Sequence, residues 1–276
     1  MAIRPRPRKR FGQHFLEPAW ADKLVEAVAP SADDDFLEIG PGPGALTLRL
    51  APRVRRLTAV ELDRDMIAAL QPRVPGNVTL VNADFLEFDL AALTGDGPLR
   101  VAGNLPYNVS SPILFKLLRD SRACPPELRR RRATGGVRDA TLMVQREVAE
   151  RIEGSPGTGD YGVLAILVQR HAGVRRLLTL PPGAFRPVPK VHSAVIRLDF
   201  RPPEVPVRDE QVFEQMVRSI FTQRRKTLAN ALRPFAEIRG AEARTVLAAA
   251  RIDGVRRPET LSIAELARLS DLLASP

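Results

Sequence analysis

Cysteine is almost absent from this chain, which has 276 residues and a single cysteine, Cys124. One thiol cannot form an intrachain disulfide, and this suits a reducing compartment. Histidine is also scarce, and His14, His171 and His192 lack the spacing of metal ligands, so no metal is expected. No apolar run approaches the ~18 residues of a membrane span, and the basic start leads into no apolar segment typical of secretory signals. We expect a cytoplasmic protein that does not bind membranes.

Aromatic residues are few, at 5% of the chain, although hydrophobic residues as a whole make up 44%. That apolar content suffices for one large core and a second, smaller domain. The chain carries 42 lysines and arginines against 32 acidic residues, a formal net charge of +10. Such an excess favours a nucleic-acid partner, with a generally basic composition as the alternative. With so few rings, recognition of shape and phosphates fits better than base stacking along an extended strand.

Short apolar runs that read as strands alternate with helical patterns over the first half of the chain. Strands are expected at 36–39, 57–62, 78–81, 99–102 and 141–144, with helices at 22–29, 45–50, 65–70 and 111–118. This alternation predicts an α/β fold, with a parallel sheet covered by helices on both faces. Strand-like runs at 174–180 and 193–200 predict an antiparallel strand at one end of the sheet.

The pattern changes after a proline-rich segment at 201–209, which reads as a linker. Beyond it, residues 211–273 have only helical periodicity, with apolar residues on one face. We therefore expect two domains. The first, 1–203, is the α/β domain with a basic N-terminal arm, and the second, 204–276, is a small all-α domain.

The first expected strand runs into a glycine-rich loop that contains Gly40, Gly42 and Gly44. Glycine allows a sharp turn and a close approach of the backbone to a ligand. The loop is therefore expected to hold the nucleoside and amino-acid parts of a cofactor. Gly40, Gly42 and Ala45 also satisfy the dinucleotide-binding fingerprint. A nicotinamide-dependent oxidoreductase is one interpretation of this loop, and a turn without a ligand is another.

Acidic residues follow the next two expected strands. Glu61 stands 21 residues after Gly40, where a carboxylate can accept hydrogen bonds from ribose hydroxyls. Asp84 follows the third strand, beside Phe85, and can accept a hydrogen bond from an adenine amine. Both acids belong at the carboxyl edge of the sheet, where open α/β sheets bind ligands. A solvated charge at Glu61 and a helix N-cap at Asp84 are the alternatives.

The tetrapeptide Asn104, Leu105, Pro106 and Tyr107 follows the fourth expected strand. The lone pair of an adenine amine is delocalised into the ring, so methylation of this amine is difficult. The Asn104 amide oxygen and the Leu105 carbonyl can accept its two hydrogens, while the Tyr107 ring stacks on the base and Pro106 fixes the turn. The rate would come from positioning and preorganised polar groups. An ordinary Asn-Pro turn is the alternative, but the shared register with the glycine loop and both acids favours catalysis.

Nearly the whole chain, from Arg8 to about Leu273, resembles the ribosomal RNA adenine dimethyltransferases, and most closely the bacterial small-subunit (16S) enzymes. The matching segments are RKRFGQHFL (8–16), FLEIGPGPGALT (36–47), AVELDRDM (59–66), NADFLEFD (82–89), GNLPYNVSSPILFKLL (103–118), MVQREVAERI (143–152), YGVLAILVQ (161–169), FRPVPKVHSAVIRL (185–198) and FTQRRKTLANAL (221–232). The resemblance implies a Rossmann-like class I methyltransferase sheet and S-adenosylmethionine as methyl donor. It also implies dimethylation of two adjacent adenines in the 3′-terminal hairpin of 16S rRNA, within the small ribosomal subunit, in support of ribosome biogenesis. A monomer is expected.

The resemblance further assigns roles to individual positions. It implies catalysis by the 104–107 turn, with Phe185 beside the target base unless that ring is a core residue. It implies cofactor contacts by His14, Leu16, Gly40, Glu61, Asp84 and Asn104. Two features depart from the family: it usually has Asn where this chain has His14, and its link before the fifth strand is shorter than residues 124–138. This longer segment, with arginines at 129–132, reads as a solvated loop or, alternatively, an RNA contact.

Two basic clusters are expected to hold RNA phosphates, with solvated charge runs as the alternative. They are Arg8, Lys9 and Arg10 in the arm and Arg224, Arg225 and Lys226 in the helical domain. Three other functions remain open. A large-subunit (23S) adenine methyltransferase of the antibiotic-resistance type tends to have Ile at the position of Leu105. An oxidoreductase leaves the 104–107 turn unexplained, and a non-catalytic ribosome assembly factor would not need Asn104.

Overall fold

The computed structural model describes residues 14–93, 98–123 and 136–274. Contacts within the chain divide it into two compact units. The first unit is formed by Met1–Ala149 and Gly173–Phe200, and the second by Glu150–Ala172 and Arg201–Pro276. The predicted site residues of the α/β domain all belong to the first unit.

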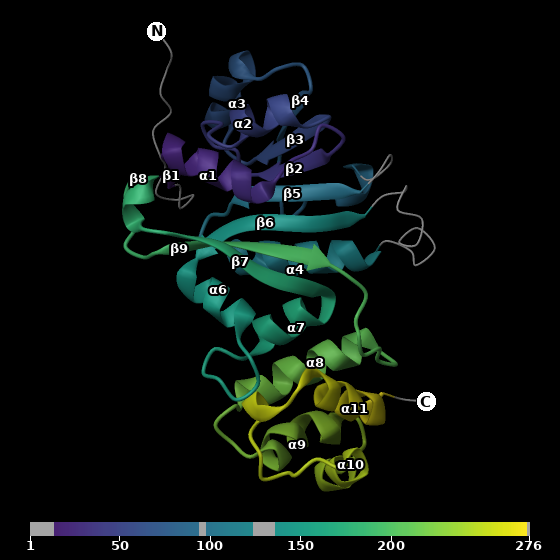
Figure 1. Cartoon of the computed structure of the whole chain (residues 1–276). Helices are drawn as coiled ribbons and strands as arrows, with labels where there is room; N and C mark the ends of the chain where they lie inside the picture. The colour runs from purple at the N-terminus through teal and green to yellow at the C-terminus, as the bar shows by residue number, and fades with distance from the viewer. Residues whose placement is uncertain (1–13, 94–97, 124–135, 275–276) are drawn as a thin grey trace. The chain divides into compact units, whose positions relative to one another are not determined.

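A seven-stranded sheet in the order β4-β3-β2-β5-β6-β9-β7 forms the centre of the first unit (Figure 1). Its strands are β2 (Asp35–Ile39), β3 (Arg56–Glu61), β4 (Val78–Asn82), β5 (Leu99–Asn104), β6 (Val137–Gln145), β7 (Ala172–Leu180) and β9 (Ser193–Phe200). The strands from β4 to β6 pair in parallel, whereas β9 is antiparallel to β6. The predicted mostly parallel α/β sheet is therefore confirmed, with its antiparallel strand next to the edge strand β7.

Burial explains why the central strands could be recognised. All five residues of β2 are buried, and a strand covered on both faces reads as a continuous apolar run. The helices that accompany these strands are α1 (Pro18–Val28), α2 (Thr47–Leu50), α3 (Arg64–Leu70) and α4 (Ser110–Ala123). Helix α3 begins where the Asp63 side chain accepts a hydrogen bond from the Asp65 backbone N–H, an ordinary N-cap.

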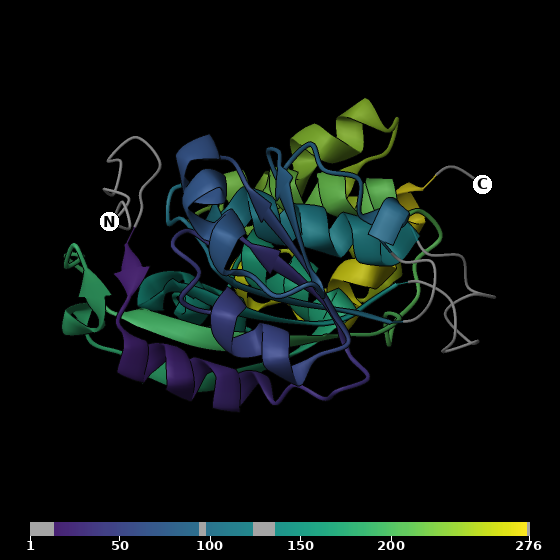
Figure 2. The ribbon, with the colours of Figure 1, turned by 90° about the horizontal axis from the view of Figure 1, so that it is seen from above.

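A short antiparallel ladder of two strands, β1 (Phe15–Leu16) and β8 (Phe185–Arg186), was not expected from the sequence. Phe15 pairs with Arg186 and Leu16 with Phe185. Figure 2 shows β1 at the start of α1 with β8 alongside it. The ladder fixes the segment that enters α1 against the segment that leads into β9. Two residues per strand are too few to produce a recognisable periodicity.

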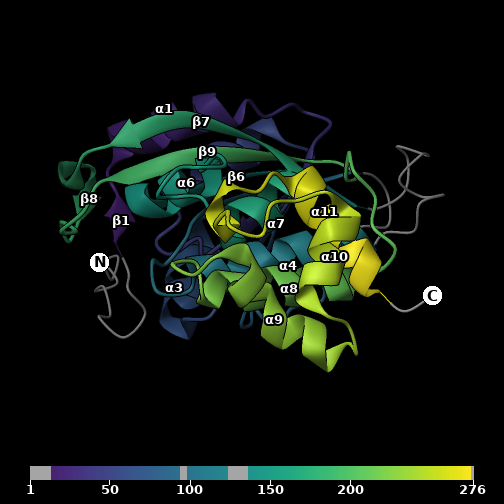
Figure 3. The same ribbon diagram turned by 90° about the horizontal axis from the view of Figure 1, so that it is seen from below.

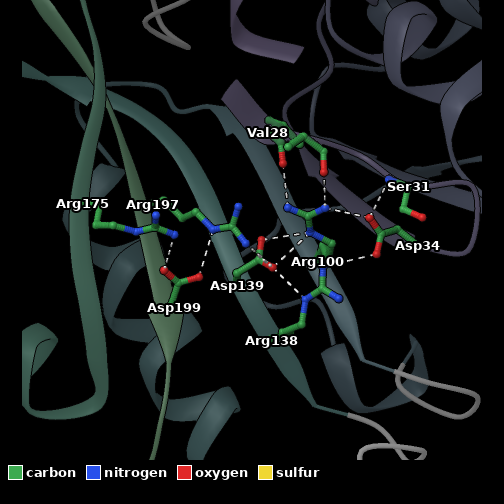
Figure 4. A network of polar contacts seen from close by, with 10 residues as sticks. Val28, Ser31, Asp34, Arg100, Arg138, Asp139, Arg175, Arg197 and Asp199 are labelled. Carbon is green, nitrogen blue, oxygen red and sulfur yellow. Dashed lines mark hydrogen bonds and ion pairs between the residues drawn. The ribbon is translucent and has the colours of Figure 1, made fainter. Parts of the chain in front are cut away.

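A buried polar network lies at the amino ends of β5 and β6 (Figure 4). The Arg100 Nε lies 3.0 Å from an Asp139 carboxylate oxygen, and the two side chains are 2% and 1% exposed. Arg100 also donates to Asp34 and to the backbone carbonyls of Val28 and Ala29 at the end of α1. These bonds satisfy a charge that would otherwise be costly to bury, and they fix α1 to the sheet.

The second unit consists of helices. They are α7 (Val163–His171), α8 (Glu210–Thr222), α9 (Leu228–Ile238), α10 (Ala243–Ala250) and α11 (Ile263–Leu273), together with the end of α6 (Arg146–Glu153). Helices α8 to α11 carry the apolar face that the sequence predicted, and Figure 3 shows them gathered together. Among the residues that the structure describes, no helix has the length and apolar character to cross a membrane.

Residues 150–172 group with these helices, although the sequence placed them before the boundary at 203. The Tyr161 ring meets the Phe221 ring edge-on, with centroids 6.2 Å apart. The Arg170 guanidinium lies 2.8 Å from Glu210 Oε1, and its side chain is 1% exposed. Packing between segments far apart in sequence therefore draws 150–172 into the helical unit. The assignment of separate functions to 1–203 and 204–276 stays a prediction.

Candidate active site

A cavity of about 250 Å³ lies at the carboxyl ends of β2, β3 and β5. The segments that follow these three strands supply much of its lining, and β1 supplies another part. This is the edge at which open α/β sheets bind ligands. Most of the predicted site residues meet here: His14, Leu16, Gly40, Glu61, Asn104, Leu105, Pro106 and Tyr107.

The glycine loop forms one wall of the cavity. Gly40 and Gly42 have φ angles of 67° and 52°, in the left-handed region that side chains disfavour and glycine adopts freely. The Gly40 N–H donates to the Val60 carbonyl at 3.0 Å, which ties the turn to the neighbouring strand β3. These residues are glycine because the loop must turn sharply at the end of a buried strand.

Glu61 ends β3 and faces this loop. Its carboxylate accepts hydrogen bonds from the backbone N–H of Gly42 at 3.0 Å and of Asp63 at 2.9 Å. Burial raises the pKa of Glu61, and the negative charge of Asp63 adds to the rise. A carboxylate has about four acceptor positions, so each oxygen can still accept a hydrogen bond from a ligand hydroxyl. Glu61 therefore lines the cavity with acceptor positions left, and its contact with a cofactor stays a prediction.

Glu38 is a pocket residue that the sequence reasoning missed. It lines the cavity, is 2% exposed, and its Oε2 has no hydrogen-bond partner in the described part of the chain. Burial raises the pKa of Glu38 to about 8, and the nearby charge of Glu61 contributes. A buried acceptor without a partner is uncommon and costly. A carboxylate within the apolar run at 36–39, just before the glycine loop, is the signal that could have revealed it.

The turn that the sequence predicts to be catalytic begins at the last residue of β5. Asn104 pairs with Met143 of β6, and the Leu105 N–H donates to the Met143 carbonyl at 3.1 Å. A Cβ at Gly103 would lie 2.7 Å from the Ile39 carbonyl oxygen, so only glycine allows β5 and β2 to approach here. Leu105 is 1% exposed, which leaves its backbone as the group that can contact a ligand.

His14 and Tyr107 complete this side of the cavity. The Asn104 side-chain amide donates to the His14 backbone carbonyl at 2.8 Å. The Tyr107 hydroxyl lies 2.6 Å from Ser193 Oγ, and burial raises the pKa of this hydroxyl, so it stays protonated near neutral pH. The Asn104 amide and the Tyr107 ring thus line the same cavity, and each contacts His14.

Two predicted residues lie elsewhere. Asp84 is not among the residues that line the cavity; its carboxylate accepts a hydrogen bond from the Leu86 N–H at 2.9 Å, so it serves as a local backbone cap. Phe185 is fully buried and belongs to the core cluster that packs around α1. This burial favours the alternative of a core residue, and a place of Phe185 beside a target base stays a prediction.

Of the two predicted basic clusters, the structure describes only the one in the second unit. Arg8, Lys9 and Arg10 lie outside the described residues, as do 124–135 with the arginines at 129–132. In the second unit, Arg225 and Lys226 are exposed in the turn after α8, and Arg224 donates to the Gly159 carbonyl at 3.1 Å. No cluster of possible metal ligands occurs within 14–93, 98–123 and 136–274.

Comparisons with known proteins show the family to which this chain belongs. The chain is 44% identical to the ribosomal RNA small subunit methyltransferase A of Pseudomonas fluorescens, over 98% of this chain and 94% of that protein. It is 42% identical to the protein of the same name from Acidithiobacillus ferrooxidans, over 97% and 94% of the two chains.

Solved structures show the same fold. A dimethyladenosine transferase from Plasmodium falciparum matches 93% of this chain and 96% of its own, with a TM-score of 0.74 and 24% identity. The 23S rRNA methyltransferase ErmE matches 94% and 99%, with a TM-score of 0.64 and 26% identity. The model of the family described as ribosomal RNA adenine dimethylase matches residues 5–269. The chain therefore belongs to the ribosomal RNA adenine dimethylase family, a family of methyltransferases.

Proposed function

We propose that this protein transfers methyl groups from S-adenosylmethionine to the exocyclic amines of two adjacent adenines in the 3′-terminal hairpin of 16S rRNA. The observation that carries the proposal is the meeting of the Asn104–Tyr107 turn with the glycine loop and Glu61 around one cavity. The names of the bacterial relatives, which refer to the small subunit, support this RNA over the large-subunit alternative. The reaction would take place in the small ribosomal subunit and support ribosome biogenesis.

The residues around the cavity fit the methyl donor. S-adenosylmethionine supplies an electrophilic methyl group, and it carries ribose hydroxyls and cationic groups. Glu61, with acceptor positions left, suits the hydroxyls, and Gly40 and Gly42 permit a close approach of the backbone. The unpartnered Oε2 of Glu38 adds a buried acceptor in the same cavity. Leu16 completes the expected donor site, while His14 lines the same cavity with its ring engaged by Tyr107 and Pro187. Asp84 Oδ1 accepts from the Leu86 N–H, and the other acceptor positions of this carboxylate are left for the expected adenine contact.

The catalytic turn provides the groups that the target amine needs. Asn104 Oδ1 and the Leu105 carbonyl accept the two amine hydrogens, which turns the nitrogen lone pair away from the ring system. The Tyr107 ring stacks on the base, and Pro106 keeps the turn fixed. No side chain has to remove a proton before transfer. The rate comes from positioning and from acceptors that are preorganised around the cavity.

RNA recognition uses the basic groups. The arm with Arg8, Lys9 and Arg10 and the turn with Arg224, Arg225 and Lys226 would hold phosphates. The helical domain would act as an RNA-binding domain.

Methyl transfer onto unmodified ribosomal subunits tests this function. Purified protein is incubated with labelled S-adenosylmethionine and either small or large subunits that lack the modification, and the modified bases are mapped. We expect two adjacent dimethylated adenines near the 3′ end of 16S rRNA. Asn104→Ala should abolish transfer and retain most of the RNA binding. Label in 23S rRNA would favour the large-subunit function.

Two further outcomes would reject the proposal. Binding of NAD without binding of S-adenosylmethionine, measured by calorimetry, would favour an oxidoreductase. An Asn104→Ala protein that still supports ribosome assembly as well as the wild type, in cells that lack the gene, would favour a non-catalytic assembly factor.

A further inference from the structure

His14 is joined to three separate parts of the first unit. Its backbone carbonyl accepts a hydrogen bond from Asn104 Nδ2 at 2.8 Å. Its imidazole is stacked on Tyr107, with ring centroids 5.5 Å apart and an interplanar angle of 23°. Its Nδ1 lies 2.7 Å from the Pro187 carbonyl oxygen. The residue that precedes β1 thereby touches the catalytic turn twice and the segment after β8 once.

The contact with Asn104 decides which end of the amide is free. A backbone carbonyl can only accept a hydrogen bond, so the NH₂ group of Asn104 has to face His14. The Oδ1 atom is then the end left for a second partner. Because Asn104 lines the cavity, the carbonyl of His14 selects the amide rotamer that offers an acceptor. A target amine needs an acceptor.

The contact with Tyr107 decides which face of the ring is free. The imidazole covers one face, and the Tyr107 hydroxyl is held at its far end by Ser193 at 2.6 Å. Centroids 5.5 Å apart leave no room for a base between the two rings. A base that stacks on Tyr107 therefore uses the opposite face of the ring. The imidazole already holds the phenol ring in place before the base binds.

The contact with Pro187 holds the imidazole in this place. The Pro187 carbonyl is an acceptor, so Nδ1 carries the hydrogen in this bond. The backbone ladder from Phe15 to Arg186 and from Leu16 to Phe185 continues the same attachment. His14 is thus fixed by its ring and by its neighbours. An asparagine, the usual residue of the family here, could donate to this carbonyl but has no ring to stack.

We propose that His14 is a positioning residue for methyl transfer, which sets the Asn104 acceptor through its carbonyl and the Tyr107 ring through its imidazole. The proposal rests on the proposed function, because it assigns a purpose to the same catalytic turn. A positioning role of His14 and the expected cofactor contact predict different kinetic effects. A positioning residue changes the rate at saturating methyl donor, whereas a residue that only binds the donor changes the donor affinity.

Three substitutions separate the ring from the hydrogen bond. His14→Phe keeps a stacked ring and loses the Nδ1 donor, His14→Asn keeps a donor and loses the ring, and His14→Ala loses both. We expect His14→Ala and His14→Asn to lower the single-turnover rate about tenfold, since small misplacements of reacting groups are costly. His14→Phe should stay within about threefold of the wild type. The donor Kd, measured by calorimetry without RNA, and the melting temperature should hardly change.

A double-mutant cycle with Tyr107→Ala tests whether His14 changes the rate of methyl transfer through Tyr107. If His14 acts through Tyr107, His14→Ala should lower the rate less than twofold in the Tyr107→Ala background, because coupled residues are not additive. Additive losses would overturn the proposal, as would a weaker donor Kd with an unchanged rate at saturation. The wild type is measured in parallel on unmodified small subunits: if it transfers no methyl groups, the proposed function fails, whereas if it is active and the cycle is additive, only the role of His14 fails.

Discussion

Arg100 and Asn104 stand at opposite ends of β5, and both donate hydrogen bonds to the N-terminal segment. Asn104 Nδ2 donates to the His14 carbonyl at 2.8 Å. Arg100 donates from Nη2 to the Val28 carbonyl at 2.7 Å and from Nη1 to the Ala29 carbonyl at 2.9 Å. One strand thus fixes both ends of residues 14–29, and the buried network of Figure 4 supports the same strand that carries the catalytic amide.

Arg100→Met should destabilise the first unit strongly. The substitution leaves Asp139, which is 1% exposed, with fewer partners and frees the carbonyls at the end of α1. Removing one partner of a buried ion pair costs about 3–5 kcal/mol. Urea denaturation measures the loss. The matched control is Arg138→Met, whose side chain contacts the same Asp139 but is 46% exposed; it should cost below about 1 kcal/mol. Equal losses of unfolding free energy in the two variants would show that burial of Arg100 does not set the cost of its removal.

Glu38→Gln should remove a pH dependence of stability. The Glu38 carboxyl has a pKa of about 8 in the folded protein against an ordinary value of 4.5. The folded state binds this proton more tightly, so the free energy of unfolding decreases as the pH rises from about 4.5 to about 8. Glutamine does not ionise. At pH ~9 the variant should be more stable than the wild type by roughly 2–4 kcal/mol.

The pH experiment compares denaturation curves of the two proteins across the same range. The difference in the free energy of unfolding between Glu38→Gln and the wild type should shrink towards pH ~5, where the Glu38 carboxyl of the folded wild type is protonated. Glu26→Gln, at an exposed position of α1, is the control for the substitution itself. A difference between Glu38→Gln and the wild type that does not change with pH would show that the buried carboxyl does not titrate in this way.

Phe185 substitutions should affect stability and leave chemistry intact. The ring is fully buried in the core around α1, so Phe185→Ala should cost about 3–5 kcal/mol. Phe185→Leu fills much of the same volume and should cost roughly 1–2 kcal/mol. Its methyl transfer rate per folded molecule, measured well below the melting temperature, should match the wild type. A stable Phe185→Leu protein with a strongly reduced rate would support the role beside the target base.

Neutralising the exposed cations after α8 should weaken RNA binding and flatten its dependence on salt. Arg225 and Lys226 are both exposed, and each phosphate contact contributes about 0.7–0.9 to the slope of log K against log salt. The double variant Arg225→Gln, Lys226→Gln should lower the slope by roughly 1–2. The control changes two other exposed arginines of the same unit, Arg208 and Arg268, to Gln. If the slope stays the same in the first variant, this turn does not contact RNA.

Local signals predicted much of the first unit. The buried strands, the glycine loop and the acid at position 61 follow from apolar runs and residue types at fixed spacing. The β1–β8 ladder escaped prediction because two residues carry no periodicity. The placement of 150–172 also escaped, since it depends on the packing of Tyr161 on Phe221 and of Arg170 on Glu210.

Individual side chains were harder to predict than elements. From the sequence, Asp84 could contact a ligand or cap the backbone. The tertiary structure shows that its carboxylate accepts a hydrogen bond from the Leu86 N–H. Phe185 belongs to a motif that suggests a base contact, yet its ring is buried. Glu38 lies in an apolar strand, so its charge was overlooked until burial and an unpartnered oxygen revealed it. Residue type limits what a side chain can do, but its neighbours decide what it does.

The sequence by itself determined the α/β order, the glycine loop after β2 and the turn after β5, because these depend on neighbours within a few residues. The tertiary structure decided which distant groups meet. Asn104 and His14 are 90 residues apart, and His14 and Pro187 are 173 apart. Such pairs are brought together by strand register and by the packing of α1, which no local pattern encodes. The orientation of the Asn104 amide, on which the proposed chemistry depends, comes from one of these distant contacts.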